Sequence, residues 1–229
     1  MSPTKLDPLR CILYTYWRSS CSWRVRAALE YKNLPYEMKP VDLLGTYLHS
    51  DEFKALNPAE YVPVLVVNGH RLTESLEGRP YIFQLAIMEY LEDMQAQPNL
   101  LPKDAADKAK VRAISLHIVS GIQPLQNASV LKFVGDDRKL EFAQHFIRRG
   151  FIGLEKMLKT TSGEYCFGDQ LTMADFCLVP QVYNAVRFKV DMNEFPTIKK
   201  INDALMKLDI FKKTHPSNQP DTPAGEKMC

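Results

Sequence analysis

The chain has 229 residues, of which 45% are hydrophobic and 24% are charged, and its formal net charge is +2 at pH 7. These values are ordinary for a globular protein, and so small a charge argues against binding to nucleic acid or to an anionic membrane. Five irregularly spaced cysteines without a Cys-x-x-Cys pair argue against a disulfide scaffold and a zinc ribbon. Without a signal-peptide pattern or an apolar run of about 18 residues, we expect a reduced, cytoplasmic protein that does not span a membrane.

The first part of the chain alternates between strand and helix patterns. Residues 10–16 predict a strand, about 20–32 a helix that ends before Pro35, and 36–42 a second strand. This order is typical of a β-α-β unit, in which the two strands are parallel. A short helical turn is predicted over residues 51–56.

The clearest hairpin in the chain lies over residues 61–72. Residues 64–67 are apolar and β-branched, and Asn68-Gly69 is a strong signal for a two-residue turn. Pro63 stands at the start of the first strand, one of the few positions that proline tolerates in a sheet, and its peptide bond is open to a cis or a trans geometry. A further helix is predicted to begin near Pro80.

Helical patterns alone follow a proline-containing linker at residues 97–102. We predict a long helix over 104–133, bent at Pro124, and further helices over 137–159, from Thr172, and over 196–213.

These patterns divide the chain into two domains and a tail. An α/β domain is expected over residues 8–96 and an all-helical domain over 103–215. Thr172 and Asp175 have the spacing of a capping box at the start of a helix. Residues 216–229 are rich in Pro, Ser, Asn and Asp, and they predict a loosely ordered tail.

A turn that carries three hydroxyls and one thiol joins the first strand to the first helix. It contains Ser19, Ser20, Cys21 and Ser22. Free backbone N–H groups and the helix dipole at such a place stabilise an anion, for example a thiolate or an oxyanion. Serine is also a preferred N-cap residue, so these residues taken alone fit a simple helix cap as well as an anion site.

The stretch from Ser19 to Arg26 resembles the Ser-Ser-Cys signature of the zeta-class glutathione transferases, the maleylacetoacetate isomerases. Other stretches resemble the same family, namely Asn57-Pro58 with Val62-Pro63, and residues 121–127, 168–175 and 188–191. The resemblance runs from about Ile12 to Pro223. It implies the cytosolic glutathione transferase architecture, with an α/β thioredoxin-like N-terminal domain followed by an all-α helical C-terminal domain.

The resemblance also implies a glutathione site. Ser19 matches the hydroxyl that donates a hydrogen bond to the glutathione sulfur and thereby favours the thiolate, and Ser20 and Cys21 share its catalytic turn. Arg187 matches a basic residue that binds a dicarboxylate substrate. The implied cofactor-binding residues are Ser19, Ser20, Cys21, Ser22, Trp23, Arg24, Val62, Glu74, Ser75, Gln123, Asn127, Ala128 and Ser129.

These residues have different implied roles. The backbone of Val62 pairs with the cysteinyl unit of glutathione, whereas Glu74 and Ser75 hold its γ-glutamyl end. Residues 123–129 reach in from the helical domain. Trp23 and Arg24 contribute scaffold or charge environment rather than chemistry. The scattered histidines predict no metal site.

The function implied by the resemblance is the glutathione-dependent cis–trans isomerisation of maleylacetoacetate to fumarylacetoacetate, a step of tyrosine and phenylalanine catabolism. Glutathione transferase activity towards small α-halo acids is implied beside it, because the same thiolate can displace a halide. A homodimer is expected by resemblance.

The chain departs from the family pattern after Ser75. About nine extra residues, Leu76 to Gln84, intervene before the stretch that resembles the family's next helix. Gly78 and Pro80 break a continuous helix there. The alternative function is therefore a catalytically impaired, glutathione-transferase-like binding or scaffolding protein, whose insertion weakens the site at Glu74 and Ser75.

Overall fold

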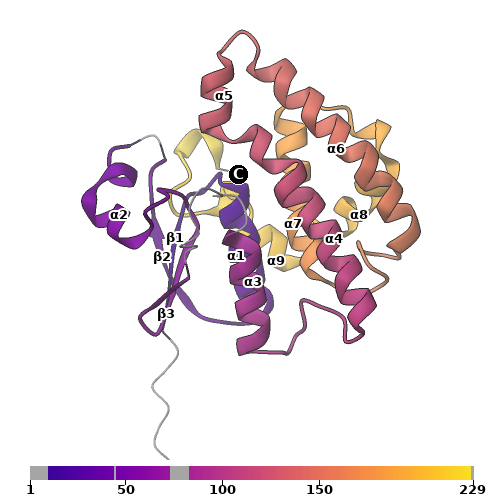
Figure 1. The fold of residues 1–229 in the computed structure, drawn as a ribbon, viewed down its shortest axis with the longest axis horizontal. Coiled ribbons are helices and arrows are strands. Elements are labelled where there is room, and N and C mark those ends of the chain that lie inside the picture. The colour runs from indigo at the N-terminus through magenta and orange to yellow at the C-terminus, as the bar shows by residue number, and fades with distance from the viewer. Residues whose placement is uncertain (1–9, 44, 73–82, 228–229) are drawn as a thin grey trace, which may run out of the picture.

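The computed structural model describes residues 10–43, 45–72 and 83–227. An α/β part, at the left of Figure 1, packs against a larger group of helices at the right. The elements of the first part are β1 (Cys11–Thr15), α1 (Ser20–Tyr31), β2 (Tyr36–Pro40), α2 (Asp51–Leu56), β3 (Val64–Val67), β4 (His70–Leu72) and α3 (Phe83–Met94). The second part contains α4 (Ala105–Gly121), α5 (Ala128–Val134), α6 (Lys139–Thr161), α7 (Met173–Arg187), α8 (Pro196–Leu205) and α9 (Asp209–Thr214).

The four strands form one mixed sheet in the order β2-β1-β3-β4. β1 pairs in parallel with β2, as a β-α-β unit requires, and β3 pairs antiparallel with β4, as a hairpin requires; the hairpin joins the sheet by the antiparallel pairing of β3 with β1. Asn68 and Gly69 both have positive φ values, 48° and 83°, the backbone conformation that a type I′ turn needs. The Val62–Pro63 peptide bond is cis. The predicted mixed α/β fold of this part is therefore confirmed.

Helix α1 lies between the sheet and the helical part, and it is buried on nearly all sides. Ala27 and Ala28 are fully buried, and their small side chains let neighbouring elements approach closely. Trp23 fills the space toward the helical part, with its ring centroid 5.6 Å from that of Tyr183 and 5.2 Å from that of His215. One continuous hydrophobic core therefore joins the two parts through α1.

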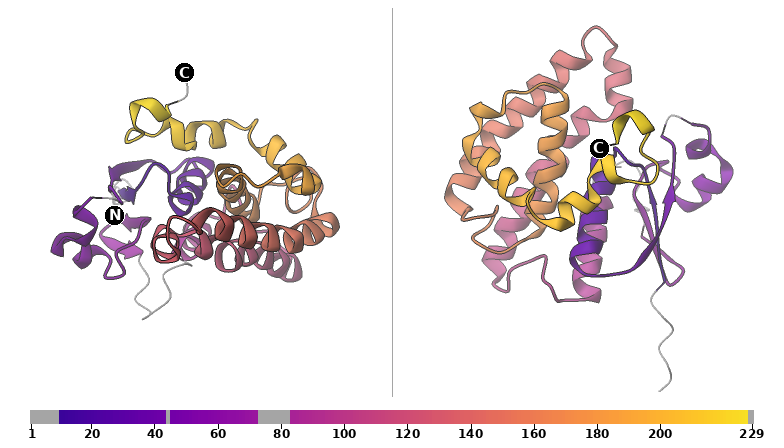
Figure 2. Two further views of the ribbon diagram at one scale, coloured as in Figure 1. Left: turned by 90° about the horizontal axis from the view of Figure 1, so that it is seen from above. Right: turned by 180° about the vertical axis from the view of Figure 1, so that it is seen from behind.

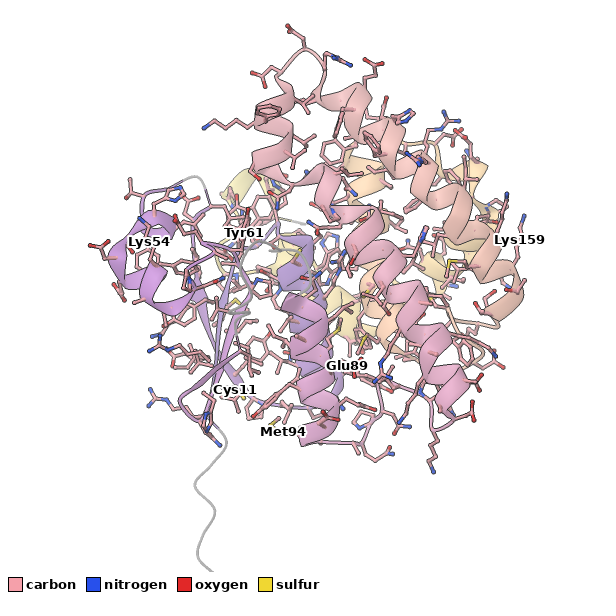
Figure 3. The ribbon with its side chains drawn as sticks, in the orientation of Figure 1. Cys11, Lys54, Tyr61, Glu89, Met94 and Lys159 are labelled. Carbon is pink, nitrogen blue, oxygen red and sulfur yellow. The ribbon has the colours of Figure 1, made fainter. Side chains whose placement is uncertain are left out.

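Ion pairs reinforce this junction on the side of α3. Glu89, labelled in Figure 3, accepts two hydrogen bonds from Arg112 of α4, at 2.6 and 2.8 Å. Glu92 binds the buried ammonium of Lys32 at 2.9 Å and also accepts from the backbone N–H of Leu100. The linker is thus fixed to α3 by side chains as well as by packing.

The predicted long helix over 104–133 is wrong in one respect, because the chain breaks there instead of bending. α4 ends at Gly121, a 3₁₀ turn covers Gln123–Gln126, and α5 begins at Ala128. Asn127 acts as the N-cap of α5, since its side chain accepts a hydrogen bond from the N–H of Ser129 at 3.2 Å. Pro124 has no N–H to continue the first helix, and the asparagine side chain satisfies the start of a new one.

The C-terminal segment also differs from its prediction. The expected helix over 196–213 is divided into α8 and α9, and residues 216–222 are packed rather than loose. Pro216 and Thr222 are buried, and the Asp221 carboxylate accepts a hydrogen bond of 2.8 Å from the backbone N–H of Trp17. Figure 2 shows this yellow segment returning to the α/β part. Its polar residues satisfy backbone groups of the protein instead of water.

Asp175 organises the start of α7, as the capping-box spacing predicts. Its side chain is fully buried and accepts hydrogen bonds from the N–H groups of Cys166 and Thr172, both at 2.8 Å, and from the Thr172 hydroxyl at 3.0 Å. The carboxylate therefore connects the loop before α7 to the first turn of the helix.

We expect Asp175→Ala to lower the free energy of unfolding by about 3 kcal/mol, because it leaves several buried donors without a partner. Urea unfolding followed by circular dichroism measures this loss. Asp104→Ala is the matched control, since Asp104 caps α4 at an exposed position and its loss costs about 1 kcal/mol. Equal losses for the two variants would contradict the organising role of Asp175.

Candidate functional site

The turn between β1 and α1 places Ser19 at the N-cap of the helix. Its backbone is extended, and its hydroxyl accepts a hydrogen bond of 3.2 Å from the N–H of Ser22. A hydroxyl that accepts in this way keeps its own hydrogen for donation to a ligand. Ser19 and Cys21 are partly exposed, whereas Ser20 is buried. Helix capping and anion binding are therefore compatible uses of the same side chain.

The thiol of Cys21 lies in the first turn of α1, beside Arg24 and Ser20. Burial raises the pKa of the Cys21 thiol, although the charge of Arg24 and a hydrogen bond with Ser20 oppose that shift. A raised pKa keeps the thiol protonated at neutral pH, and the thiolate is the nucleophilic form of cysteine. Cys21 is thus better suited to shaping the turn than to attacking a substrate.

The segment before β3 contains Val62 and the cis-bonded Pro63. It lies beside β1, the strand that leads into the turn at Ser19, because β3 pairs with β1. Asn57 holds this segment: its side chain donates to the carbonyl of Tyr61 at 2.9 Å and accepts from the N–H of Ala59 at 3.1 Å. Figure 3 labels Tyr61 at the end of the sheet near the upper end of α1. A buried asparagine thus fixes the approach to Val62.

Arg187, at the end of α7, comes close to the turn from the other part of the chain. Its guanidinium interacts electrostatically with Arg18, Tyr183 and Tyr16. Its side chain retains exposed surface, yet partial desolvation, and then the charge of Arg18, lower the pKa of the Arg187 guanidinium. Arg187 therefore interacts electrostatically with Arg18, the residue directly before Ser19, and neither arginine forms an ion pair with a carboxylate among the described residues.

Arg18 is the functional candidate that sequence reasoning did not assign. It stands directly before the Ser-Ser-Cys stretch, but nothing in the local pattern indicates that its side chain would meet one from α7. What identifies Arg18 is its electrostatic interaction with Arg187, because neither arginine has a carboxylate partner among the described residues. That interaction depends on how the two parts of the chain pack, so no sequence pattern could have indicated it.

The residues expected to reach in from the helical part lie around the α4–α5 break. Gln123 is buried, and its side-chain oxygen has no hydrogen-bond partner among the described residues. The Asn127 side chain is used as a cap, while Ala128 and Ser129 are exposed. Within the described residues, no hydrogen bond connects these four residues to the turn at Ser19, so their roles in binding stay predictions.

Three members of the turn's own helix have different environments. Trp23 is buried, and its indole N–H donates to the Thr214 hydroxyl at 2.9 Å, so its side chain belongs to the core. Ser22 is fully buried behind the cap. Arg24 is fully buried as well.

The expected γ-glutamyl contacts, Glu74 and Ser75, lie outside the described residues. So does most of the inserted stretch predicted from Leu76 to Gln84; within it, the structure describes only the backbone of Phe83 and the buried Gln84. The weakening of the site by the insertion therefore stays a prediction.

Other kinds of site are not found in the described part of the chain. No cluster of three or more His, Cys, Asp or Glu side chains is arranged to hold a metal ion there, and no helix in these ranges is long and apolar enough to cross a membrane. The four described cysteines, Cys11, Cys21, Cys166 and Cys177, are free thiols. Two hollows around Phe167 lie in the helical part and touch none of the residues of the turn.

The fold and the turn define a class of protein. The family model described as "Glutathione S-transferase, N-terminal domain" matches residues 18–94, and "Glutathione S-transferase, C-terminal domain" matches residues 126–213. The chain therefore belongs to the glutathione S-transferase family, with a thioredoxin-like first domain and a helical second domain.

Within that family, the similarity is to the zeta class. Maleylacetoacetate isomerase of Mus musculus is 52% identical over 215 residues, which cover 93% of this chain and 95% of the relative. A crystal structure of maleylacetoacetate isomerase from Anaeromyxobacter dehalogenans 2CP-1, with bound dicarboxyethyl glutathione and citrate in the active site, is 40% identical, with a TM-score of 0.81 and coverage of 95% of this chain and 100% of that one.

A third relative carries the name of the class. The holo structure of maleyl pyruvate isomerase, a bacterial glutathione S-transferase in the zeta class, is 36% identical with a TM-score of 0.86, and the match covers 93% of this chain and 100% of that one. These similarities extend over both domains, so they include the turn at Ser19 and the helix that carries Arg187.

Proposed function

We propose that this protein is a glutathione-dependent cis–trans isomerase that converts maleylacetoacetate to fumarylacetoacetate. The observation that carries the proposal is the turn at Ser19, where a hydroxyl that accepts from Ser22 and donates to no described residue lies at the N-terminus of α1, directly after Arg18, which interacts electrostatically with Arg187 of α7. The similarity to maleylacetoacetate isomerases over nearly the whole chain supports the choice of reaction.

The residues of the turn suit a bound thiol. When bound, glutathione supplies a sulfur nucleophile that adds reversibly to the cis double bond, allows rotation about the resulting single bond and leaves again. The Ser19 hydroxyl donates to the sulfur, and the N-terminus of α1 adds partial positive charge, so both favour the thiolate. The buried side-chain oxygen of Gln123, which has no hydrogen-bond partner among the described residues, is a further group that suits a polar ligand.

The two arginines suit a dicarboxylate substrate. Arg18 and Arg187 repel each other electrostatically, since the charge of Arg18 lowers the pKa of Arg187. An anion with two carboxylates compensates both charges at once and accepts hydrogen bonds from guanidinium groups. The dicarboxyethyl glutathione in the Anaeromyxobacter relative carries two carboxylates of this kind. Arg18 and Arg187 would orient the substrate so that its double bond meets the sulfur.

Maleylacetoacetate is favoured over maleylpyruvate because identity to the mouse maleylacetoacetate isomerase is 52%, against 36% to the maleyl pyruvate isomerase. Transferase activity toward small α-halo acids is proposed as a side reaction of the same thiolate. A cytoplasmic homodimer is proposed from the family alone, and sedimentation velocity would test the dimer.

The test is binding followed by turnover. Purified full-length protein is expected to be retained on immobilised glutathione and to isomerise maleylacetoacetate only when free glutathione is present. Maleylpyruvate, assayed in parallel, should be converted with a lower kcat/KM. Retention without any turnover, or no retention on immobilised glutathione, would refute the proposed isomerase function.

The alternative function, an impaired binding or scaffolding protein, is favoured only by the extra residues 76–84. Deleting these residues separates the two functions. An active enzyme should gain no more than a few-fold in glutathione affinity from the deletion, measured by isothermal titration calorimetry. A gain of 100-fold or more, about 2.7 kcal/mol, combined with no turnover by the intact chain, would establish that the insertion disables the site.

A further inference from the structure

Two arginines are fully buried on α1, and their surroundings are opposite in kind. Arg26 is surrounded by acceptors: its guanidinium donates to the Thr15 hydroxyl at 2.9 Å and to the carbonyls of Tyr16, Trp17 and Thr214 at 3.2, 3.1 and 3.5 Å. Burial lowers the pKa of Arg26 to about 10, and Tyr36 and Asp221 oppose this shift. Arg26 is therefore a structural cation held by four acceptors at its two Nη atoms, and only its Nε atom has no hydrogen-bond partner among the described residues.

Arg24 lacks such partners. Its side chain is also fully buried, and its Nε and Nη2 atoms have no hydrogen-bond partner among the described residues. Its Nη1 atom is 4.0 Å from the sulfur of Cys21, the first turn's thiol. No carboxylate forms an ion pair with Arg24 in the described part of the chain.

The groups that face Arg24 from the neighbouring helices do not neutralise it. Cys177 of α7 interacts electrostatically with Arg24, but burial raises the pKa of the Cys177 thiol to about 11, so it is uncharged at neutral pH. Ser115 of α4 forms a hydrogen bond with that thiol and carries no charge. Cys21 is a thiol as well, because burial raises its pKa.

A buried, uncompensated cation is costly, and its position increases the cost. Guanidinium groups remain charged in proteins, and a buried charge without a partner is strongly unfavourable. Arg24 also lies near the N-terminal end of α1, where the helix dipole is itself positive. An anion that binds at the Ser19–Cys21 turn relieves both effects at once.

We propose that Arg24 is a positioning residue of the glutathione site, whose charge, unpaired among the described residues, maintains a positive potential beneath the Ser19–Cys21 turn and thereby stabilises the thiolate of bound glutathione. This inference rests on the proposed function. The charge of Arg24 is in place before glutathione binds. Because this charge is buried without a partner among the described residues, it lowers the stability of the free protein.

The experiment compares Arg24→Met with Arg24→Lys and with the matched control Arg26→Met. The thiol pKa of bound glutathione is read from thiolate absorbance in the ultraviolet as the pH is raised. We expect Arg24→Met to increase that pKa by about one unit and Arg24→Lys to restore most of the difference. If Arg24→Met does not fold, Arg24→Gln takes its place.

Two further measurements distinguish an electrostatic role from a structural one. Affinity for S-methylglutathione, which has no thiol to ionise, should change less than about two-fold in Arg24→Met, because the proposed charge acts on the thiolate. The melting temperature should be equal to or higher than that of the unsubstituted protein, since an unpaired buried charge is removed. Arg26→Met should instead lower it, because four acceptors lose their donor.

An unchanged thiol pKa in Arg24→Met would overturn the inference, and so would an equal loss of affinity for glutathione and S-methylglutathione. The unsubstituted protein separates this failure from that of the proposed function. If it does not lower the thiol pKa of bound glutathione below that of free glutathione, both the proposed function and the inference fail. If it does, and Arg24→Met lowers that pKa to the same extent, only the inference fails.

Discussion

Ser19→Ala is expected to reduce kcat/KM for the isomerisation of maleylacetoacetate by at least about 10-fold, because one hydrogen bond to a charged group contributes about 1.5–3 kcal/mol. The thiol pKa of bound glutathione should rise at the same time. Affinity for S-methylglutathione should change much less, since that ligand presents no thiolate to the hydroxyl. Steady-state kinetics and the thiolate absorbance measure the two effects.

Ser19 also caps α1, so a loss of stability must be separated from a loss of chemistry. The matched control is Ser50→Ala. Ser50 is the N-cap of α2, and its hydroxyl accepts from the N–H of Phe53 at 3.1 Å, much as Ser19 accepts from Ser22 at 3.2 Å. Each alanine variant should lose about 1 kcal/mol of unfolding free energy, but only Ser19→Ala should lose activity. Ser19→Thr should retain part of the rate. Full activity in Ser19→Ala would remove the hydroxyl from the mechanism.

Arg187→Gln is expected to raise the KM for maleylacetoacetate by about 10- to 100-fold, the equivalent of one charge-assisted hydrogen bond. Glutathione affinity should stay within about two-fold, because the proposed partner of Arg187 is the substrate carboxylate. An uncharged electrophile should be conjugated at nearly the original rate. These three measurements assign Arg187 to the substrate rather than to the cofactor.

Arg18→Gln should show the same pattern, and a double-mutant cycle with Arg187→Gln tests whether both arginines act on one dianion. Arg148→Gln is the matched control, since Arg148 is an exposed arginine of the helical domain that is paired with Glu194. It should leave every kinetic constant unchanged. A rise in KM for the uncharged electrophile equal to that for maleylacetoacetate would contradict carboxylate recognition by Arg187.

Sequence patterns predicted the structure correctly where backbone groups form their hydrogen bonds with residues close in the sequence or in the next strand. The capping residues Thr172 and Asp175, the Asn68-Gly69 turn and the β-α-β order all place hydrogen bonds within a few residues or between successive strands. The sequence therefore predicted the mixed α/β first domain and the helical second one. The resemblance carried by the Ser-Ser-Cys stretch identified the family, which the comparisons confirmed.

Sequence patterns gave a wrong prediction where a polar side chain could form its hydrogen bonds with either of two partners. Residues 104–133 have a continuous helical pattern, but the Asn127 side chain caps a new helix and ends the old one. Residues 216–222 have the composition of a solvated tail, yet Asp221 satisfies the N–H of Trp17, 204 residues away in the sequence. Composition cannot distinguish a polar side chain that binds water from one that binds a distant backbone group.

By itself, then, the sequence determined the two-domain architecture and the position of the Ser19 turn at the start of α1, because helix caps, turns and strand pairing depend on near neighbours. Only the tertiary structure decided which charges are compensated. Arg24 and Arg26 are two residues apart on one buried helix, yet one meets four acceptors and the other meets a thiol. The electrostatic interaction of Arg18 with Arg187 likewise exists only because α7 packs against α1. Electrostatic free energy depends on distance in space and on burial, and neither is specified by spacing along the chain.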